Sequence, residues 1–198
     1  MRYDCLNALA ESDIEKIIGI LQHIDFARII SIAQRIAEAL EKGAKVMLCG
    51  NGGSASQAQH LAAELVCRFK FERRAFDARA LTTDTSILTA QANDSGFDTV
   101  FERQVEACGL RGDILIGLST SGNSQNIINA IRMAKQMGLY TIAFTGEDRE
   151  SSIAAIADEV LYVESPDTPR IQEAHLVIGH IVCEIVELLL TSLREREL

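Results

Sequence analysis

Short apolar runs alternate with helical segments through most of the chain, and this alternation limits the fold more than any other feature. Four runs read as buried strands, at residues 46–49 (VMLC), 114–118 (ILIGL), 141–144 (TIAF) and 160–163 (VLYV), and residues 78–81 (ARAL) form a weaker fifth. Strands separated by helices are joined by right-handed crossovers, which gives a parallel sheet with helices on both faces. We therefore expect a three-layer α/β/α sandwich around a five-stranded parallel sheet.

The segments that flank this pattern read as helices. Residues 4–42 hold two stretches with apolar residues near helical spacing, and Gly43 ends the second. Residues 168–193 read as one long helix with Pro169 in its first turn. Because the chain has 198 residues, we expect one domain, with a helical arm over residues 1–43 and an α/β core over residues 44–198.

Charge and cysteine usage exclude several classes of protein. With 28 acidic and 19 basic residues the net charge is −9, which disfavours sequence-independent binding to nucleic acid. The five cysteines are widely spaced without a CxxC pair, so we interpret them as small buried hydrophobes in a reducing compartment. The N-terminus has acidic residues among its apolar ones, unlike a signal peptide, and no apolar run approaches the ~20 residues of a membrane span. We expect a cytoplasmic protein with no nucleic-acid or membrane partner.

Two loops that follow strands carry residues suited to a phosphorylated ligand, and parallel α/β sheets bind ligands at this edge. In residues 49–54 (CGNGGS), glycines let the backbone approach a ligand, and Ser54 is placed to cap the next helix. In residues 119–124 (STSGNS), hydroxyls and the N–H groups of a helix from Gln125 form an uncharged cradle for a phosphate monoester. Either loop alone is also consistent with an ordinary turn and cap. Their common position favours one phosphorylated ligand.

Two spaced pairs of polar residues have the residue types of a metal site. His60 and Glu64 lie four residues apart and so leave the same face of a predicted helix. Gln172 and His180 lie eight residues apart and reach toward one side of the last helix. Zinc prefers such ligands, but a His/Glu pair at this spacing is more often a surface hydrogen bond. The spacing alone leaves both interpretations open.

Four segments of the chain have a more specific pattern: CGNGGSASQAQHLAAEL, LTAQANDSGF, GLSTSGNSQNII and TPRIQEAHLVIGH. Together they resemble the sugar isomerase (SIS) domain family and, within it, the phosphoheptose isomerases. The similarity extends from the N-terminal helices to Glu187. It implies one SIS domain over residues 1–198 with a flavodoxin-like sheet. It also implies a homotetramer with active sites near subunit interfaces, and one divalent metal ion per subunit, usually zinc.

The resemblance also implies roles for individual residues. It assigns the metal to His60, Glu64, Gln172 and His180. The positions that it implies contact the sugar phosphate are Asn51, Gly52, Gly53, Ser54, Glu64, Arg68, Asn93, Asp94, Ser119, Thr120, Ser121, Ser124 and Gln172. Without the resemblance, the pair at 93–94 reads as a turn before Gly96, and Arg68 as a solvated surface residue. We expect His175 in the core and His23 on the surface.

The chemistry that the resemblance implies explains why a carboxylate and an imidazole are needed. Aldose–ketose isomerisation moves a proton between neighbouring carbons through an enediol, so it requires a base, an acid and stabilisation of an oxyanion. Glu64 is the candidate base, and His180 the candidate acid, because an imidazole exchanges protons readily near neutral pH. Metal coordination weakens a base, so metal binding and proton transfer compete. Gln172 has an amide that suits either the metal or the substrate carbonyl.

The leading interpretation is an isomerase that converts sedoheptulose 7-phosphate to D-glycero-D-manno-heptose 7-phosphate, for the heptose of cell-envelope polysaccharide. One alternative is a non-catalytic SIS module that binds a phosphosugar and associates with a replication initiator protein. Such modules typically lack the glutamate and the C-terminal histidine, so Glu64 and His180 favour catalysis. A second alternative is a phosphosugar-sensing regulatory domain. Those proteins usually carry a DNA-binding domain, and the short acidic N-terminal helices do not resemble one.

Overall fold

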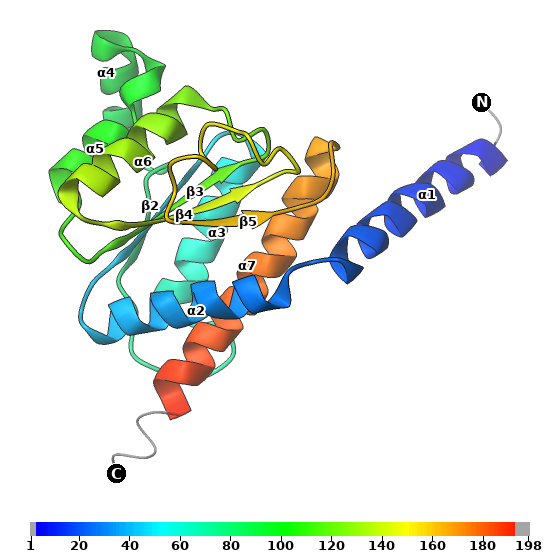
Figure 1. The fold of residues 1–198 in the computed structure, drawn as a ribbon, viewed down its shortest axis with the longest axis horizontal. Coiled ribbons are helices and arrows are strands. Elements are labelled where there is room, and N and C mark those ends of the chain that lie inside the picture. Colours follow the sequence, from blue (N-terminus) through cyan, green and yellow to red (C-terminus); the bar gives the residue numbers. More distant parts are fainter. Residues whose placement is uncertain (1–2, 193–198) are drawn as a thin grey trace.

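The computed structural model describes residues 3–192 and contains a five-stranded sheet with helices on both faces (Figure 1). The strands are β1 (Val46–Gly50), β2 (Ala78–Ala80), β3 (Ile114–Ser119), β4 (Tyr140–Thr145) and β5 (Glu159–Tyr162). All neighbouring strands pair in parallel, in the order β2-β1-β3-β4-β5. This is the strand order of flavodoxin-like folds. The predicted fold class is therefore confirmed.

The helices form two layers, one on each face of the sheet (Figure 1). One layer consists of α2 (Phe26–Glu41), α3 (Gly53–Val66) and α7 (Thr168–Ser192). The other contains α5 (Glu102–Cys108) and α6 (Gln125–Met137), with α4 (Thr85–Ser95) and the 3₁₀ turn η1 (Phe97–Thr99) beside them. Successive strand residues point to opposite faces, so Ile116 packs in the first core and Leu115 in the second. The sheet is thus buried on both sides, which explains its continuous apolar runs.

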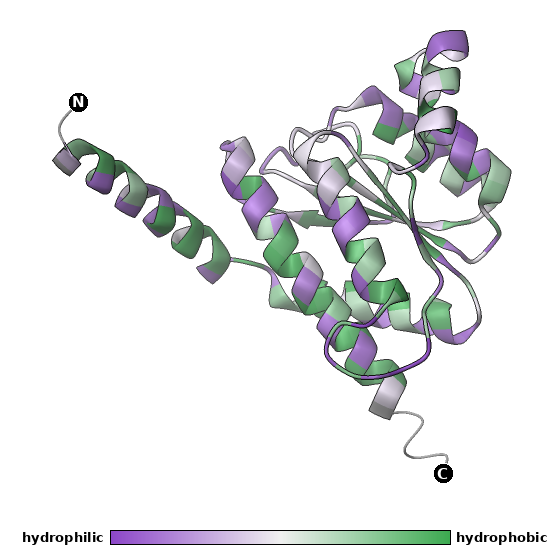
Figure 2. Cartoon of the chain, turned by 180° about the vertical axis from the view of Figure 1, so that it is seen from behind, coloured by the Kyte–Doolittle hydropathy of each residue, from purple (hydrophilic) through white to green (hydrophobic). Residues whose placement is uncertain are grey.

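Helix α1 (Tyr3–Gln22) projects from the rest of the molecule as an arm (Figure 1). Figure 2 shows hydrophobic and hydrophilic bands alternating along it. Five of its large apolar residues are exposed: Tyr3, Leu6, Leu9, Ile14 and Ile18. At its base, Arg170 of α7 donates to the backbone oxygen of Asp13, at 3.1 Å. The two predicted N-terminal helices are confirmed: α2 buries its apolar face against the core, whereas α1 packs against it only through Ile17, Ile20 and Leu21 near its end.

Helix α7 departs from the expectation that no stretch has the length of a membrane span. Within the described residues, 168–191 are long and apolar enough to cross a bilayer, and α1 with α2 would pass only as a bent pair. Half of that part of α7 is buried inside the fold, and the core helix of a soluble protein passes the same test. Its buried His175 and Glu187 both bond to other parts of the chain. Packing in the core therefore accounts for the apolar character of α7.

The cysteines are only partly where the sequence predicts them. Cys49 and Cys183 are buried, and burial raises the pKa of each thiol to about 12. Cys108 is half-buried, whereas Cys5 and Cys67 are exposed. The expectation of burial is wrong for these last two because one lies on the projecting arm and the other just after the end of α3.

Candidate active site

Helices α3 and α7 run side by side and in the same direction. Near the start of both, a Cβ atom on Gly53 would lie 2.6 Å from Oε1 of Gln172. Further along, a Cβ atom on Gly179 would lie 2.6 Å from Cδ1 of Leu61. The missing side chains let the two helix axes approach closely. Residues of α3 and α7 that are about 120 positions apart in the chain thereby lie next to each other along one side of this helix pair.

Three side chains with metal-ligating atoms meet at this edge. Nε2 of His60 lies 2.7 Å from Nε2 of His180 and 3.2 Å from Oε1 of Glu64. One ligand atom from each residue lies within 4.8 Å of the other two. His60 is exposed, and Glu64 and His180 are half-buried, so the cluster is open to solvent. The structure thus brings together the proposed base, the proposed acid and a third ligand.

This donor set fits a zinc ion. Tetrahedral zinc holds imidazole nitrogens at about 2.0–2.1 Å, which places neighbouring ligand atoms about 3.3 Å apart. The His60–Glu64 distance of 3.2 Å already matches this spacing. The two imidazoles, at 2.7 Å, would have to separate by only about 0.6 Å. Two imidazoles and one carboxylate also leave a coordination position free for a water molecule or substrate oxygen.

Gln172, the fourth predicted ligand, lies elsewhere on α7. Eight residues separate it from His180, which corresponds to about 12 Å along a helix axis. Its amide lies against Gly53, and its Nε2 is 3.5 Å from Oγ of Ser54. Its backbone oxygen accepts a hydrogen bond from Nε2 of Gln57 at 2.5 Å. The structure therefore places Gln172 against the loop over residues 50–54 at the start of α3, which we call the glycine loop. The role of Gln172 as a metal ligand stays a prediction.

The loop over residues 50–54 joins β1 to α3 at the carboxyl edge of the sheet. Gly52 has a φ of +55° and occupies the N-cap position of α3. Ser54 was expected to cap this helix, but it lies inside the first turn and its buried hydroxyl makes no capping bond, so that expectation is wrong. Asn51 and Asn126 exchange two amide hydrogen bonds of 2.9 Å. Since Asn126 lies in α6, these bonds tie the first loop to the helix that follows the second loop.

The loop over residues 119–124 follows β3 at the same edge. Oγ of Ser119 and Oγ of Ser124 lie 3.1 Å apart. Helix α6 begins at Gln125, as predicted, and Ser124 takes its N-cap position without a side-chain capping bond. Gly122 has a φ of +65°, and a Cβ atom there would collide with Oγ of Ser151. A hollow of about 230 Å³ beside the loop is lined by Thr120 and Ser121, by the acidic residues Glu147 and Asp148 after β4, and by residues around the start of α7. The hydroxyls and helix start expected to hold a phosphate are thus together.

Three predicted substrate contacts lie on exposed surfaces. Arg68 forms an ion pair with Glu72. Asn93 and Asp94 lie within α4 and are joined by a 2.8 Å hydrogen bond. The turn expected at these two residues is wrong because α4 continues to Ser95, and only then does Gly96, with a φ of +94°, end it. Their contacts with substrate stay predictions.

The remaining histidines are placed as the sequence predicts. His175 is fully buried, and its Nε2 donates to the backbone oxygen of Thr145 at 3.2 Å. Burial lowers the pKa of His175 to about 4, although the hydrogen bond with Thr145 opposes the shift. Its Nδ1 has no hydrogen-bond partner among the described residues. His23 is exposed and contacts the backbone oxygen of Gly19.

Sequence reasoning missed a buried ion pair beside the cluster. Arg73 and Glu187 lie 2.9 Å apart with side chains 4% and 1% exposed. Glu187 also accepts hydrogen bonds from the backbone of residues 69–71. Burial would raise its pKa, but these bonds and the charge of Arg73 outweigh that effect and hold the pKa below its ordinary value. The available signal was a carboxylate in the apolar stretch 181–190, because a charge there needs a partner.

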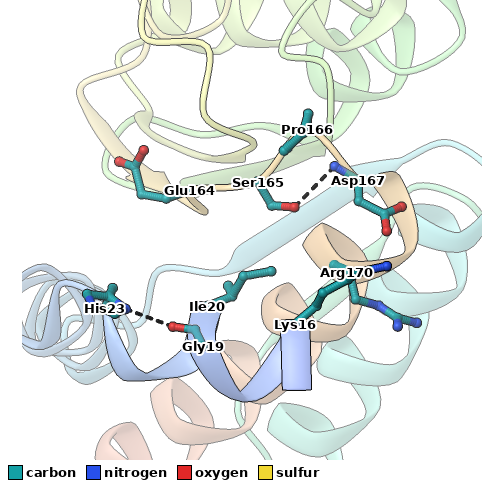
Figure 3. Close-up of a pocket in the computed structure, with 9 residues that line it drawn as sticks. All are labelled: Lys16, Gly19, Ile20, His23, Glu164, Ser165, Pro166, Asp167 and Arg170. Carbon is teal, nitrogen blue, oxygen red and sulfur yellow. Dashed lines mark hydrogen bonds between the residues drawn. The ribbon is translucent and has the colours of Figure 1, made fainter. Parts of the chain in front are cut away.

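A larger hollow, of about 590 Å³, lies between the arm and the connection from β5 to α7 (Figure 3). Lys16, Ile20 and His23 of the N-terminal region face Glu164, Asp167 and Arg170 across it. It shares Ser165 and Pro166 with the smaller hollow beside the loop over residues 119–124, which we call the Ser/Thr loop. The base of the arm therefore reaches close to the predicted phosphate site.

Comparison with known proteins connects this geometry to a family. The model of the SIS domain family matches residues 12–146. The phosphoheptose isomerase of Aquifex aeolicus is 56% identical over 160 residues, which cover 81% of this chain and 83% of that protein. The chain belongs to the phosphoheptose isomerase family. The phosphoheptose isomerase of Clostridium acetobutylicum is 52% identical over 173 residues, covering 87% of both chains.

A solved phosphoheptose isomerase has the same fold over nearly its whole length. The structure from Neisseria gonorrhoeae matches with a TM-score of 0.86 and 40% identity, and covers 92% of this chain and 98% of that one. The SIS match includes His60, Glu64 and both loops but ends before His180. Membership of the phosphoheptose isomerases makes catalysis the favoured interpretation over a non-catalytic SIS module.

Proposed function

We propose that this chain interconverts sedoheptulose 7-phosphate and D-glycero-D-manno-heptose 7-phosphate, which supplies heptose for cell-envelope polysaccharide. The observation that carries the proposal is the meeting of Glu64 and His180, which come from different helices, with His60 in one cluster. A base and an acid within a few ångströms of each other are what a proton transfer between adjacent carbons requires. The family supports the substrate.

The Ser/Thr loop and the glycine loop provide the binding half of the site. The phosphate is held by two sets of groups in this proposal. One is the backbone N–H groups at the start of α6, and the other is the hydroxyls of Ser119, Thr120, Ser121 and Ser124. The backbone of residues 51–54 and the amide of Gln172 contact the sugar hydroxyls, because they lie at the same edge of the sheet. The metal ion, when bound by His60, Glu64 and His180, supplies polarisation of the sugar oxygens. We propose that it is zinc, one ion per subunit.

Proton transfer in both directions uses only two side chains, and it competes with their binding of the metal ion, because an atom that holds the metal cannot carry a proton at the same time. The Glu64 carboxylate takes a proton from C1 of the ketose, while protonated His180 donates one to the C2 carbonyl oxygen, and the enediol forms. His180 then removes the proton from the C1 hydroxyl, and Glu64 returns its proton to C2. The product is the aldose, and both residues regain their starting charge.

We propose further that the chain is one cytoplasmic SIS domain that forms a homotetramer through its arm. The exposed apolar residues of α1 support this, because a soluble monomer seldom leaves such a row of large side chains in water. Residues 1–43 would then be an assembly element, and residues 44–198 the catalytic core.

The test is turnover of sedoheptulose 7-phosphate by metal-stripped protein with and without added zinc. We expect zinc-dependent aldose formation, and a fall in kcat of about 100- to 10,000-fold in Glu64→Gln and His180→Gln. His23→Gln is the matched control, since His23 is exposed and lies outside the cluster. Folded wild-type protein that binds the sugar phosphate but does not turn it over would refute the isomerase and favour the non-catalytic module.

A further inference from the structure

The carboxylate of Glu187 on α7 gathers most of the contacts that hold the segment connecting α3 to β2. Oε1 of Glu187 accepts hydrogen bonds from the backbone N–H of Phe69, at 3.0 Å, and from Nε of Arg73, at 2.9 Å. Its Oε2 accepts from the backbone N–H of Lys70, at 2.6 Å, and of Phe71, at 3.0 Å. Four donors thus converge on a side chain that is 1% exposed. A buried charge with this many bonds holds the segment firmly in one arrangement.

Arg73 extends this contact to the end of α3. Its Nη2 donates to the backbone oxygen of Glu64 at 2.9 Å, and its Nη1 donates to the backbone oxygen of Arg74 at 3.0 Å and lies 3.5 Å from that of Cys67. The last carbonyls of a helix have no partner inside the helix. Arg73 therefore caps α3 at the turn that carries the proposed base.

The same segment also contacts the other half of the cluster. The ring of Phe69 lies 5.6 Å from the imidazole of His180, between centroids. Nζ of Lys70 lies 2.6 Å from Oε1 of Glu184, one turn beyond His180 on α7. The segment is thus attached at one side to the helix of Glu64 and at the other to the helix of His180.

We propose that Glu187 and Arg73 are a positioning pair that sets the distance between Glu64 and His180. Neither residue touches the reacting atoms, and both act through backbone that carries or contacts the cluster. This inference rests on the proposed function, because the distance matters for a shared metal ion and for a relay of protons between the two groups. Partners of this kind around a metal site typically change metal affinity or activity by about 10- to 100-fold.

Glu187→Gln is the sharpest variant because it is isosteric. It keeps one oxygen but turns the other into an NH₂ group, which faces backbone donors and loses their bonds. Arg73→Lys keeps the charge but loses the forked contact to Glu187 and Glu64. Asp113→Asn is the matched control, since Asp113 and Lys45 form another buried ion pair with backbone contacts, between the residues that precede β3 and β1.

The experiment measures cobalt(II) affinity and the visible spectrum of the cobalt-loaded protein, and separately kcat and KM with zinc. We expect about 10- to 100-fold weaker cobalt binding and a similar fall in kcat for Glu187→Gln, with KM for the sugar phosphate changed less than about twofold. The cobalt bands should shift, because the ligand geometry changes. Asp113→Asn should leave all four quantities near wild type, although it lowers stability.

Three outcomes decide the inference. Unchanged cobalt binding, spectrum and kcat in folded Glu187→Gln and Arg73→Lys would overturn it. Equal losses in Asp113→Asn would also overturn it, because they would reflect general destabilisation. If the wild type lacks isomerase activity, the proposed function fails, but weaker cobalt binding in Glu187→Gln alone still supports the positioning pair. If that variant does not fold, Arg73→Lys decides by the same readouts.

Discussion

His175 should make the stability of the protein fall as the pH is lowered from 7 to 4.5. Its pKa is about 4 in the folded protein against an ordinary value of 6.5, because its buried imidazole resists protonation. The unfolded chain therefore binds this proton first. The stabilisation is fully present above pH 6.5, is lost progressively as the pH falls toward 4, and changes no further below that.

The size of the effect follows from the two pKa values. The two pKa values differ by about 2.5, which corresponds to about 3 kcal/mol in the free energy of unfolding. About 2 kcal/mol of this stabilisation is lost between pH 7 and pH 4.5. For a chain of this size such a loss corresponds to a fall of roughly 4–8 °C in Tm. Carboxylates titrate in part of the same range, so the comparison must be made between variants.

The assay is urea unfolding, followed by far-UV circular dichroism, at several pH values and a fixed protein concentration. His175→Gln keeps a donor for the backbone oxygen of Thr145 but does not titrate. We expect its stability to be lower at pH 7 and to change about 2 kcal/mol less than the wild type down to pH 4.5. His23→Gln, at an exposed site, should follow the wild type. Parallel curves for wild type and His175→Gln would refute the reasoning.

Two further predictions concern the phosphate loop and the assembly. Gly122→Ala should raise KM for the sugar phosphate about tenfold or more, because the new methyl group collides with Ser151. Gly112→Ala is the control: Gly112 also has a positive φ, of +92°, but a methyl group there meets open space, so KM should be unchanged. Steady-state kinetics decide between them, and equal KM values would contradict the role of the loop. Light scattering should give a mass near four times 21.7 kDa. A monomer mass would contradict the tetramer.

The fold could be predicted well because its signals are local and repeated. The apolar runs of the strands mark a sheet buried on both faces, and the glycine after β1 and the hydroxyls after β3 lie where ligands bind in such sheets. The pairing of α3 with α7 could not be derived from spacing. It depends on close approach at Gly53 and Gly179, and such contacts depend on three-dimensional packing rather than on any period in the sequence.

The site was predictable in its residue types but not in its arrangement. His60 and Glu64 share a helix face by their spacing, whereas the approach of His180 came from the resemblance alone. Gln172 has the residue type of a ligand, yet packing places it at the glycine loop. The pair of Arg73 and Glu187 was missed because a carboxylate in an apolar stretch indicates that it needs a partner but not which residue the fold brings to it.

The side-by-side course of α3 and α7 has a consequence for biosynthesis. The ribosome adds about 5–20 residues per second, so the 120 residues between His60 and His180 take about 6–24 s to make. During that time the nascent chain carries only two of the three convergent donors. The cluster of His60, Glu64 and His180 is complete only after strands β2 to β5, which lie between the two helices in the sequence, have been synthesised. The order of translation thus makes the third donor, His180, the last of the three to be made.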